Sequence, residues 1–173
     1  DAGEVAARFE RLWPRLGRAA AASGAEVLRL FVERVGLLQE EVVGEISFRH
    51  RSFQEYLAAD SANFESNLRA LAGRSGDDQW RETIVLAFGL ANRKDQKVLL
   101  NGILGKARQL KTDNARRQRL LLALACLETG VDVAPELRRA ALDAAREVFP
   151  PHSAEEAAQV ARAGEMAVDL LRY

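Results

Sequence analysis

Residues that commonly carry catalysis or bind metal ions are scarce in this sequence. Cys126 is the only cysteine, and His50 and His152 are the only histidines. A single cysteine excludes an internal disulfide and a cysteine-rich metal site, and two distant histidines without metal-ligand spacing do not suggest a zinc site. Ser/His/Asp and Cys/His catalysis also depend on a suitably placed histidine. We therefore expect no catalytic residue, no metal site and no cofactor of this segment's own.

A net charge and a long apolar run are missing as well. Twenty-five Lys and Arg residues balance twenty-five Asp and Glu residues, so no overall field attracts nucleic acid or an anionic membrane. No apolar run approaches the roughly 18 residues that a membrane-spanning helix needs, and residues 1–4 do not begin a signal peptide. We expect a cytoplasmic segment of a longer chain, with no membrane contact and with nucleic acid an improbable partner.

A phosphate-binding P-loop, which reads G-x-x-x-x-G-K-[ST], is not found. The nearest approach is residues 102–107, Gly-Ile-Leu-Gly-Lys-Ala. The spacing of its glycines is wrong, and Ala107 stands where a hydroxyl should meet the metal ion. We expect Gly102 and Gly105 to be small residues at a helix packing contact.

Helix is the structure that most of the sequence predicts, because Ala, Leu, Glu and Arg are abundant and apolar residues recur at helical spacing. Pro14 is expected to kink the first helix or to restart it after Trp13. Gly36 suits a left-handed C-terminal cap. Capping boxes are predicted where a serine precedes a glutamate by three residues, at Ser23, Ser52 and Ser153. The predicted helices cover about residues 4–22, 23–36, 52–71, 78–91, 95–110, 114–128, 135–149 and 153–171.

Residues 37–50 are the stretch that predicts β-structure. Ile46, Phe48 and His50 alternate with polar residues, a period of two, and Gly44 suits the turn. The order helix, helix, hairpin is that of a winged-helix module. Apolar side chains in and after the hairpin are expected to belong to its core: Phe48, Phe53, Tyr56, Leu57, Phe64, Leu68 and Leu71.

The polar, glycine-bearing loop at residues 73–78 predicts a domain boundary. We therefore expect a mainly α protein with a winged-helix domain over residues 1–72, which includes one short β-hairpin. Residues 73–173 would form HEAT-like antiparallel helix pairs, because helix starts recur about every twenty residues and each pair must stack on a neighbour to bury its apolar face.

His50 is the candidate functional residue, and two interpretations of it remain open. The strand pattern puts its side chain on the inward face with Ile46 and Phe48, which favours a packed residue of the hairpin. His50 also ends the strand just before a helix N-terminus, which attracts anions and favours a neutral imidazole able to donate one hydrogen bond. A phosphate contact is therefore the alternative. His152, in a Pro-Pro-His-Ser loop, is expected to be a solvated residue at the start of a helix.

A basic stretch over residues 93–119 has nine cationic residues against Asp95 and Asp113. Such a stretch is most often a solvated helical face, and no aromatic residue is interleaved for base stacking. The second helix, which would be the recognition helix of a DNA-binding winged helix, offsets Arg29 and Arg34 with two glutamates. Binding of DNA through the stretch would depend on Arg116, Arg117 and Arg119.

Residues 46–59, Ile-Ser-Phe-Arg-His-Arg-Ser-Phe-Gln-Glu-Tyr-Leu-Ala-Ala, resemble a known signature. It is the winged-helix signature of the NACHT-type STAND ATPases, NLR-like signalling proteins that commonly read F-x-H-x-[ST]-F-Q-E-[YF]-x-A. Residues 30–39 are similar to that family's helix leading into the wing. Residues 77–82 and 122–129 are similar to the helices that follow in bacterial members.

The resemblance implies a regulatory role in a larger ATPase. An upstream nucleotide-binding domain would carry the P-loop and bind ADP or ATP with Mg²⁺, and His50 would contact the β-phosphate of ADP and hold the closed state. Exchange for ATP, prompted by a protein or phage ligand on the C-terminal helices, would release the winged helix and allow self-oligomerisation, in antiphage or innate-immune-like defence. The alternatives are a HEAT-like interaction scaffold without a nucleotide link and a nucleic-acid-binding winged helix.

Overall fold

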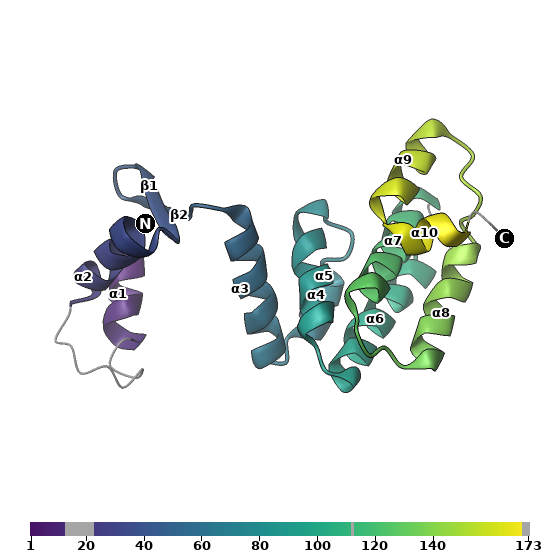
Figure 1. The fold of residues 1–173 in the computed structure, drawn as a ribbon, viewed down its shortest axis with the longest axis horizontal. Coiled ribbons are helices and arrows are strands. Elements are labelled where there is room, and N and C mark those ends of the chain that lie inside the picture. Colours follow the sequence, from purple (N-terminus) through teal and green to yellow (C-terminus); the bar gives the residue numbers. More distant parts are fainter. Residues whose placement is uncertain (13–22, 112, 171–173) are drawn as a thin grey trace. The chain divides into compact units, whose positions relative to one another are not determined.

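A computed structural model describes residues 1–12, 23–111 and 113–170, apart from the side chain of Asp169. The protein is mainly α, 73% helical, with ten α-helices and one two-stranded antiparallel hairpin among the described residues (Figure 1). The chain forms two compact units, residues 1–54 and 55–173. None of the described helices has the length and apolar character required to cross a membrane.

The N-terminal unit begins with α1 (Ala2–Leu12) and α2 (Gly24–Arg29), and α2 continues into the π-helix η2 (Leu30–Val35). The capping box at Ser23 is confirmed, because the Ser23 hydroxyl accepts from Glu26 N and the Glu26 carboxylate accepts from Ser23 N. The left-handed cap at Gly36 is confirmed by its φ of 66°. The predicted effect of Pro14 lies outside the described residues.

Helices α1 and α2 pack closely at Gly24. A Cβ atom at Gly24 would lie 1.9 Å from the carbonyl oxygen of Ala6, so only glycine fits this crossing. The rings of Phe9 on α1 and Phe31 on η2 stack with centroids 5.1 Å apart. Apolar side chains of α1 and η2 therefore meet at this contact.

The predicted hairpin is confirmed. Strands β1 (Leu38–Val42) and β2 (Glu45–Phe48) pair antiparallel, with Leu38 opposite Phe48. Gly44 provides the turn at a φ of 83°, and its carbonyl oxygen accepts from Ala2 N at 2.7 Å. This hydrogen bond ties the start of α1 to the hairpin.

The remaining elements begin with α3, which spans the division between the units. For most of these elements the predicted bounds lie within a few residues of the observed ones, and helix ends are rarely defined more precisely than that. Two breaks were not predicted: Ser66, with a φ of 57°, separates α3 from α4, and Gly164, with a φ of 99°, separates α9 from α10. The elements are α3 (Arg51–Phe64), α4 (Leu68–Gly73), η3 (Asp78–Trp80), α5 (Arg81–Leu90), α6 (Arg93–Arg108), α7 (Asp113–Thr129), α8 (Pro135–Arg146), α9 (Ala154–Arg162) and α10 (Glu165–Asp169).

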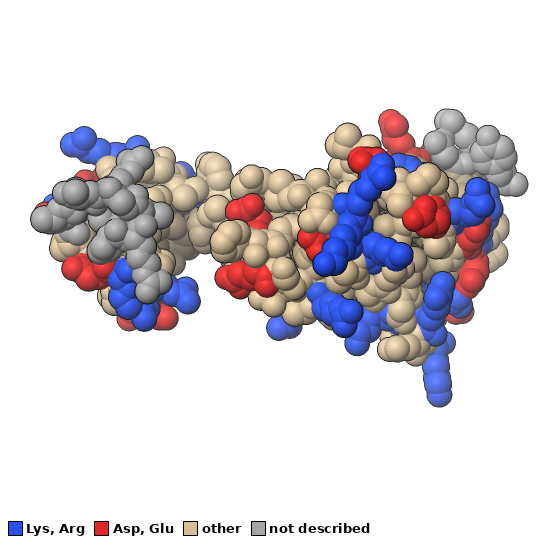
Figure 2. Space-filling model, turned by 90° about the horizontal axis from the view of Figure 1, so that it is seen from below, with Lys and Arg blue, Asp and Glu red and all other residues tan. Residues whose placement is uncertain are grey.

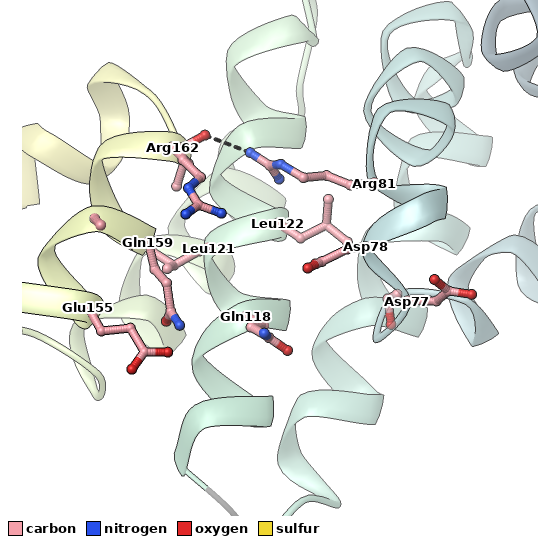
Figure 3. Close-up of a pocket in the computed structure, with 12 residues that line it drawn as sticks. Asp77, Asp78, Arg81, Gln118, Leu121, Leu122, Glu155, Gln159 and Arg162 are labelled. Atoms are coloured by element: carbon pink, nitrogen blue, oxygen red, sulfur yellow. Dashed lines mark hydrogen bonds between the residues drawn. The ribbon is translucent and has the colours of Figure 1, made fainter. Parts of the chain in front are cut away.

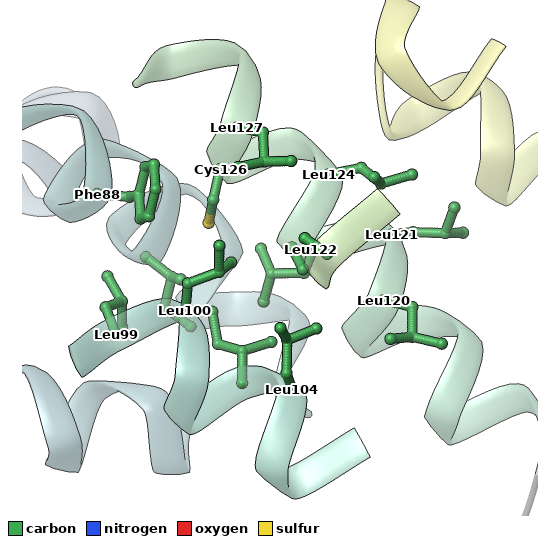
Figure 4. Packing of buried hydrophobic residues seen from close by; sticks show 14 of the residues in the cluster. Phe88, Leu99, Leu100, Leu104, Leu120, Leu121, Leu122, Leu124, Cys126 and Leu127 are labelled. Atoms are coloured by element: carbon green, nitrogen blue, oxygen red, sulfur yellow. The ribbon is translucent and has the colours of Figure 1, made fainter. Parts of the chain in front are cut away.

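Helix α7 is the centre of the C-terminal unit. Residues 120–127 are all buried, and α7 packs against α5, α6, α8 and α10 (Figure 4). A helix that is apolar on every side must be covered on every side. Cys126 lies in this segment with no exposed surface, and burial raises the pKa of its thiol to about 12. It behaves as a small apolar side chain, as predicted.

The division into units falls earlier than the predicted boundary at residues 72 and 73. Leu68 and Leu71 on α4 are buried in the same cluster as Ile84 and Leu99 of the following helices. Residues 55–72 therefore belong to the C-terminal unit. The loop at residues 73–78 reverses the chain inside one core, and loop composition alone does not distinguish such a reversal from a domain linker.

Candidate functional site

His50 lies between the last residue of β2 and the first residue of α3. Its side chain is exposed, and its ring centroid is 5.9 Å from that of Phe53, one turn into the helix. The expectation that it faces inward with Ile46 and Phe48 is wrong, because β2 ends at Phe48 and the alternation stops there. Ile46 and Phe48 are half-buried, whereas His50 is open to solvent.

Ser52 is not the cap of α3. The helix begins at Arg51, so Ser52 lies within its first turn, and the amide of Phe53 donates to the carbonyl oxygen of His50 at 3.1 Å. His50 is therefore the residue immediately before the helix, two residues after the end of β2. Its imidazole stands at the positive end of a helix of 14 residues.

Four side chains on α3 that were predicted to be core are exposed: Phe53 at 43%, Tyr56 at 46%, Leu57 at 42% and Phe64 at 90%. The helix instead buries the face that contains Ala59, and the amide of Asn63 donates to the carbonyl oxygen of Ala87 on α5 at 3.0 Å. The helical spacing identified which residues share a face. It did not identify the face that other elements cover.

The basic stretch over residues 93–119 is not one patch. Arg93 pairs with Asp132, Arg116 with Glu147, and Arg117 with Glu156. Arg117 is itself buried, at 6% exposure, and the guanidinium of Arg119 donates to the carbonyl oxygen of Ala115 and fills the space beside Gly76. The three arginines on which DNA binding was predicted to depend are therefore engaged in internal contacts.

His152 is exposed in the loop before α9, as predicted. Its backbone amide donates to the Glu156 carboxylate at 2.6 Å, and the Ser153 hydroxyl accepts from the amide of Glu156 at 3.2 Å. The pKa of Glu156 is lowered, first by the hydrogen bond from the His152 amide and then by Arg117, whose effects outweigh the opposing effect of burial. These contacts cap α9 and do not form a binding site.

A pocket of about 400 Å³ in the C-terminal unit was not predicted from the sequence (Figure 3). Side chains from residues 75–78, the start of α5, the middle of α7 and the length of α9 line it. Arg81 bridges two of its walls by donating to the carbonyl oxygen of Arg162 at 2.7 Å. The lining residues are Ser75, Asp77, Asp78, Arg81, Gln118, Leu121, Leu122, Glu155, Ala158, Gln159, Arg162 and Ala163.

The chemistry of this pocket is that of a polar recess. Its lining includes neither cysteine nor histidine, and the hydroxyl of Ser75, although buried, has no hydrogen-bond partner that could activate it. Among the described residues, no group of three or more His, Cys, Asp or Glu side chains could hold a metal ion. Sequence spacing gave no signal for the pocket because its walls lie far apart along the chain.

Comparison with protein-family models, with curated proteins and with solved structures found no match to this chain. The resemblance to NACHT-type STAND ATPases therefore depends on the sequence alone, on the motif over residues 46–59 and on the similar segments 30–39, 77–82 and 122–129.

Proposed function

We propose that this chain is the regulatory segment of a NACHT-type STAND signalling ATPase. The winged-helix region would hold the closed, ADP-bound state, and HEAT-like helix pairs would form a sensor or scaffold region. The observation that carries the proposal is the position of His50, exposed at the junction of β2 and α3 within the motif over residues 46–59.

His50 has the surroundings that a phosphate contact requires. Its imidazole is accessible, so a ligand held by another domain can reach it. The N-terminal end of α3 carries partial positive charge, which favours an anion beside the ring. A neutral imidazole can donate one hydrogen bond to a phosphate oxygen.

The wider function follows from that contact. An upstream nucleotide-binding domain of the same chain would bind ADP or ATP with Mg²⁺, and the contact from His50 would favour the ADP state. Binding of a protein or phage ligand would favour release, nucleotide exchange and self-oligomerisation. The biological role would be antiphage or innate-immune-like defence in the cytoplasm, and the segment would be no enzyme by itself.

The test is ADP retention by the full-length gene product. The protein is purified, denatured, and its bound nucleotide is measured by chromatography. We expect the wild type to carry ADP and His50→Ala to lose most of it, since the phosphate contact is gone. His152→Ala is the matched control, because it removes the other histidine, also exposed, and should retain ADP. Equal ADP content in all three proteins would exclude the phosphate role.

A scaffold without a nucleotide link is the second candidate. It is favoured by the polar pocket beside Arg81 and Arg162, which a partner protein could fill. The two functions differ in one simple observation, because only the first requires a Walker A motif in the region of the gene before residue 1. If that region lacks the motif, the scaffold is the better description.

A further inference from the structure

A second hollow in the C-terminal unit, a groove of about 480 Å³ between α4 and α6, is lined by cations. Arg69 lies on the α4 side, and Lys94, Lys97 and Lys106 lie on the α6 side. Its lining includes no acidic residue among those that the structure describes. Figure 2 shows several Lys and Arg side chains on one face of this unit, with Asp and Glu side chains among them.

The groove cations differ from several arginines of the basic stretch in that they form no ion pair with any residue that the structure describes. Arg93, Arg116 and Arg117 are neutralised by carboxylates. Within the described part of the chain, none of the four groove cations forms an ion pair. All four are exposed. Positive charge is thus left uncompensated in one groove, although the chain as a whole is neutral.

Asp95 carries the nearest carboxylate along α6, and this carboxylate does not pair with the groove cations. Its carboxylate accepts a hydrogen bond from the side-chain amide of Asn92 at 2.7 Å, and its backbone amide donates to the side-chain oxygen of Asn92 at 3.1 Å. Asp95 therefore takes part in capping α6 and is not among the residues that line the groove.

The groove is long for a small anion. Lys94 and Lys106 are twelve residues apart on one helix, which corresponds to about 18 Å along its axis. One strand of B-form DNA carries a phosphate about every 3.4 Å of axis, so the rim could follow roughly five phosphates. The lining also includes Ala72, Gly73 and Gly102, whose side chains are small or absent.

We propose that this groove binds the phosphate backbone of a nucleic acid without reading its sequence. Three of the four cations are lysines, which meet phosphates as point charges and do not impose the paired geometry that arginine offers to carboxylates. Its lining includes no aromatic residue on which a base could stack. Arg29 and Arg34, on the helix that resembles a recognition helix, take no part. The site is separate from His50 and independent of the proposed function.

The experiment is fluorescence anisotropy with the full chain and two labelled 20-base-pair DNA duplexes of unrelated sequence, at 50 to 200 mM NaCl. Four phosphate contacts give a slope of log affinity against log salt near −3.6, or roughly a 100-fold loss across that range. The two duplexes should bind equally, since backbone contacts carry no sequence information. Absence of binding at 50 mM NaCl would overturn the proposal.

Variants locate the site. Lys94→Gln, Lys97→Gln and Lys106→Gln together should reduce the slope by about 2.7, since each phosphate contact contributes about 0.9. The matched control removes the same charge elsewhere, through Arg29→Gln, Arg34→Gln and Arg139→Gln, and should bind as wild type does. Equal loss in both triple variants would show a general charge effect and contradict a defined groove.

A single substitution and a competitor complete the test. Asn101→Glu places a carboxylate at the lining of the groove and should weaken binding while every lysine is kept. Poly-L-glutamate at the same charge concentration should displace DNA less well than unlabelled duplex. If poly-L-glutamate competes as well or better, the groove binds acidic peptide and the assignment to nucleic acid is wrong.

Discussion

Gly102 on α6 lies against Ala72 on α4 so closely that a Cβ atom at Gly102 would be 2.6 Å from the Cβ of Ala72. Gly105, three residues later on the same helix, has open space where a Cβ would stand. The sequence grouped both glycines as packing residues. The structure confirms that role for Gly102 and contradicts it for Gly105.

The two glycines should respond to alanine in opposite directions. Gly105→Ala should raise the free energy of unfolding by about 0.5–1 kcal/mol, because alanine is the better helix former. Gly102→Ala should lower it by about 1–3 kcal/mol, because the new methyl group overpacks the contact with Ala72. Urea unfolding of the chain, followed by circular dichroism, measures both. Ala72→Gly should rescue Gly102→Ala, and equal stability of the two alanine variants would contradict the close helix contact.

Leu124 at the centre of α7 should be one of the costliest side chains to shorten. It is fully buried, so Leu124→Ala should lower the free energy of unfolding by about 2–5 kcal/mol through lost burial and a residual cavity. Val131→Ala is the control, because Val131 is 98% exposed and its change should stay within about 0.5 kcal/mol. Similar urea midpoints for the two variants would show that α7 is not the core helix.

Cys126 gives an independent measure of the same core. Its thiol is buried, with a pKa raised to about 12, so a thiol reagent at pH 8 can label it only after the unit opens. When reclosing is fast, the labelling rate follows the population of the open state. Leu124→Ala should therefore speed labelling by roughly 30-fold or more, since each 1.4 kcal/mol is tenfold. Rapid labelling of the wild type would show that the thiol is accessible.

Glu156 should make the stability of the C-terminal unit depend on pH. Its pKa is lowered by the His152 amide and by Arg117, from an ordinary value of 4.5. A carboxylate whose pKa is lowered in the folded state stabilises the protein at pH values above its unfolded-state pKa. This contribution is lost as the pH falls through its folded-state pKa. Glu156→Gln should thus be less stable than wild type at pH 7, and the difference should shrink below about pH 4. Urea unfolding of both proteins at several pH values tests this, and a stability difference that stays constant from pH 7 to below pH 4 would contradict it.

Gly36 should tolerate asparagine better than alanine. Its φ of 66° is left-handed, a conformation that costs a residue with a Cβ atom about 1–2 kcal/mol and that asparagine adopts more readily. Hydrogen exchange at the amide of Leu37, which donates to the carbonyl oxygen of Phe31 at 3.2 Å, reports on this cap. Gly36→Ala should exchange faster than Gly36→Asn, and the reverse order would contradict the cap.

Local features of the fold were predictable because the interactions that form them lie within a few residues. The capping box at Ser23, the N-cap at Ser153, the left-handed cap at Gly36 and the turn at Gly44 each need only neighbouring groups. At Ser153 the box is half formed, because the Glu156 carboxylate accepts from the amide of His152 and not from that of Ser153. Such geometry can be inferred from residue type and spacing. The position of His50 just before a helix N-terminus was predicted for the same reason, although the strand ends two residues earlier than expected.

The sequence by itself determined the helices, the hairpin, the buried thiol of Cys126 and the scarcity of catalytic residues. Only the tertiary structure decided which face of α3 is covered, that Arg117 is buried against Glu156, and that Arg69 joins three lysines of α6. Periodicity states which side chains share a face, but burial and ion pairing depend on what packs against that face. The groove and the polar pocket therefore exist only once distant helices come together.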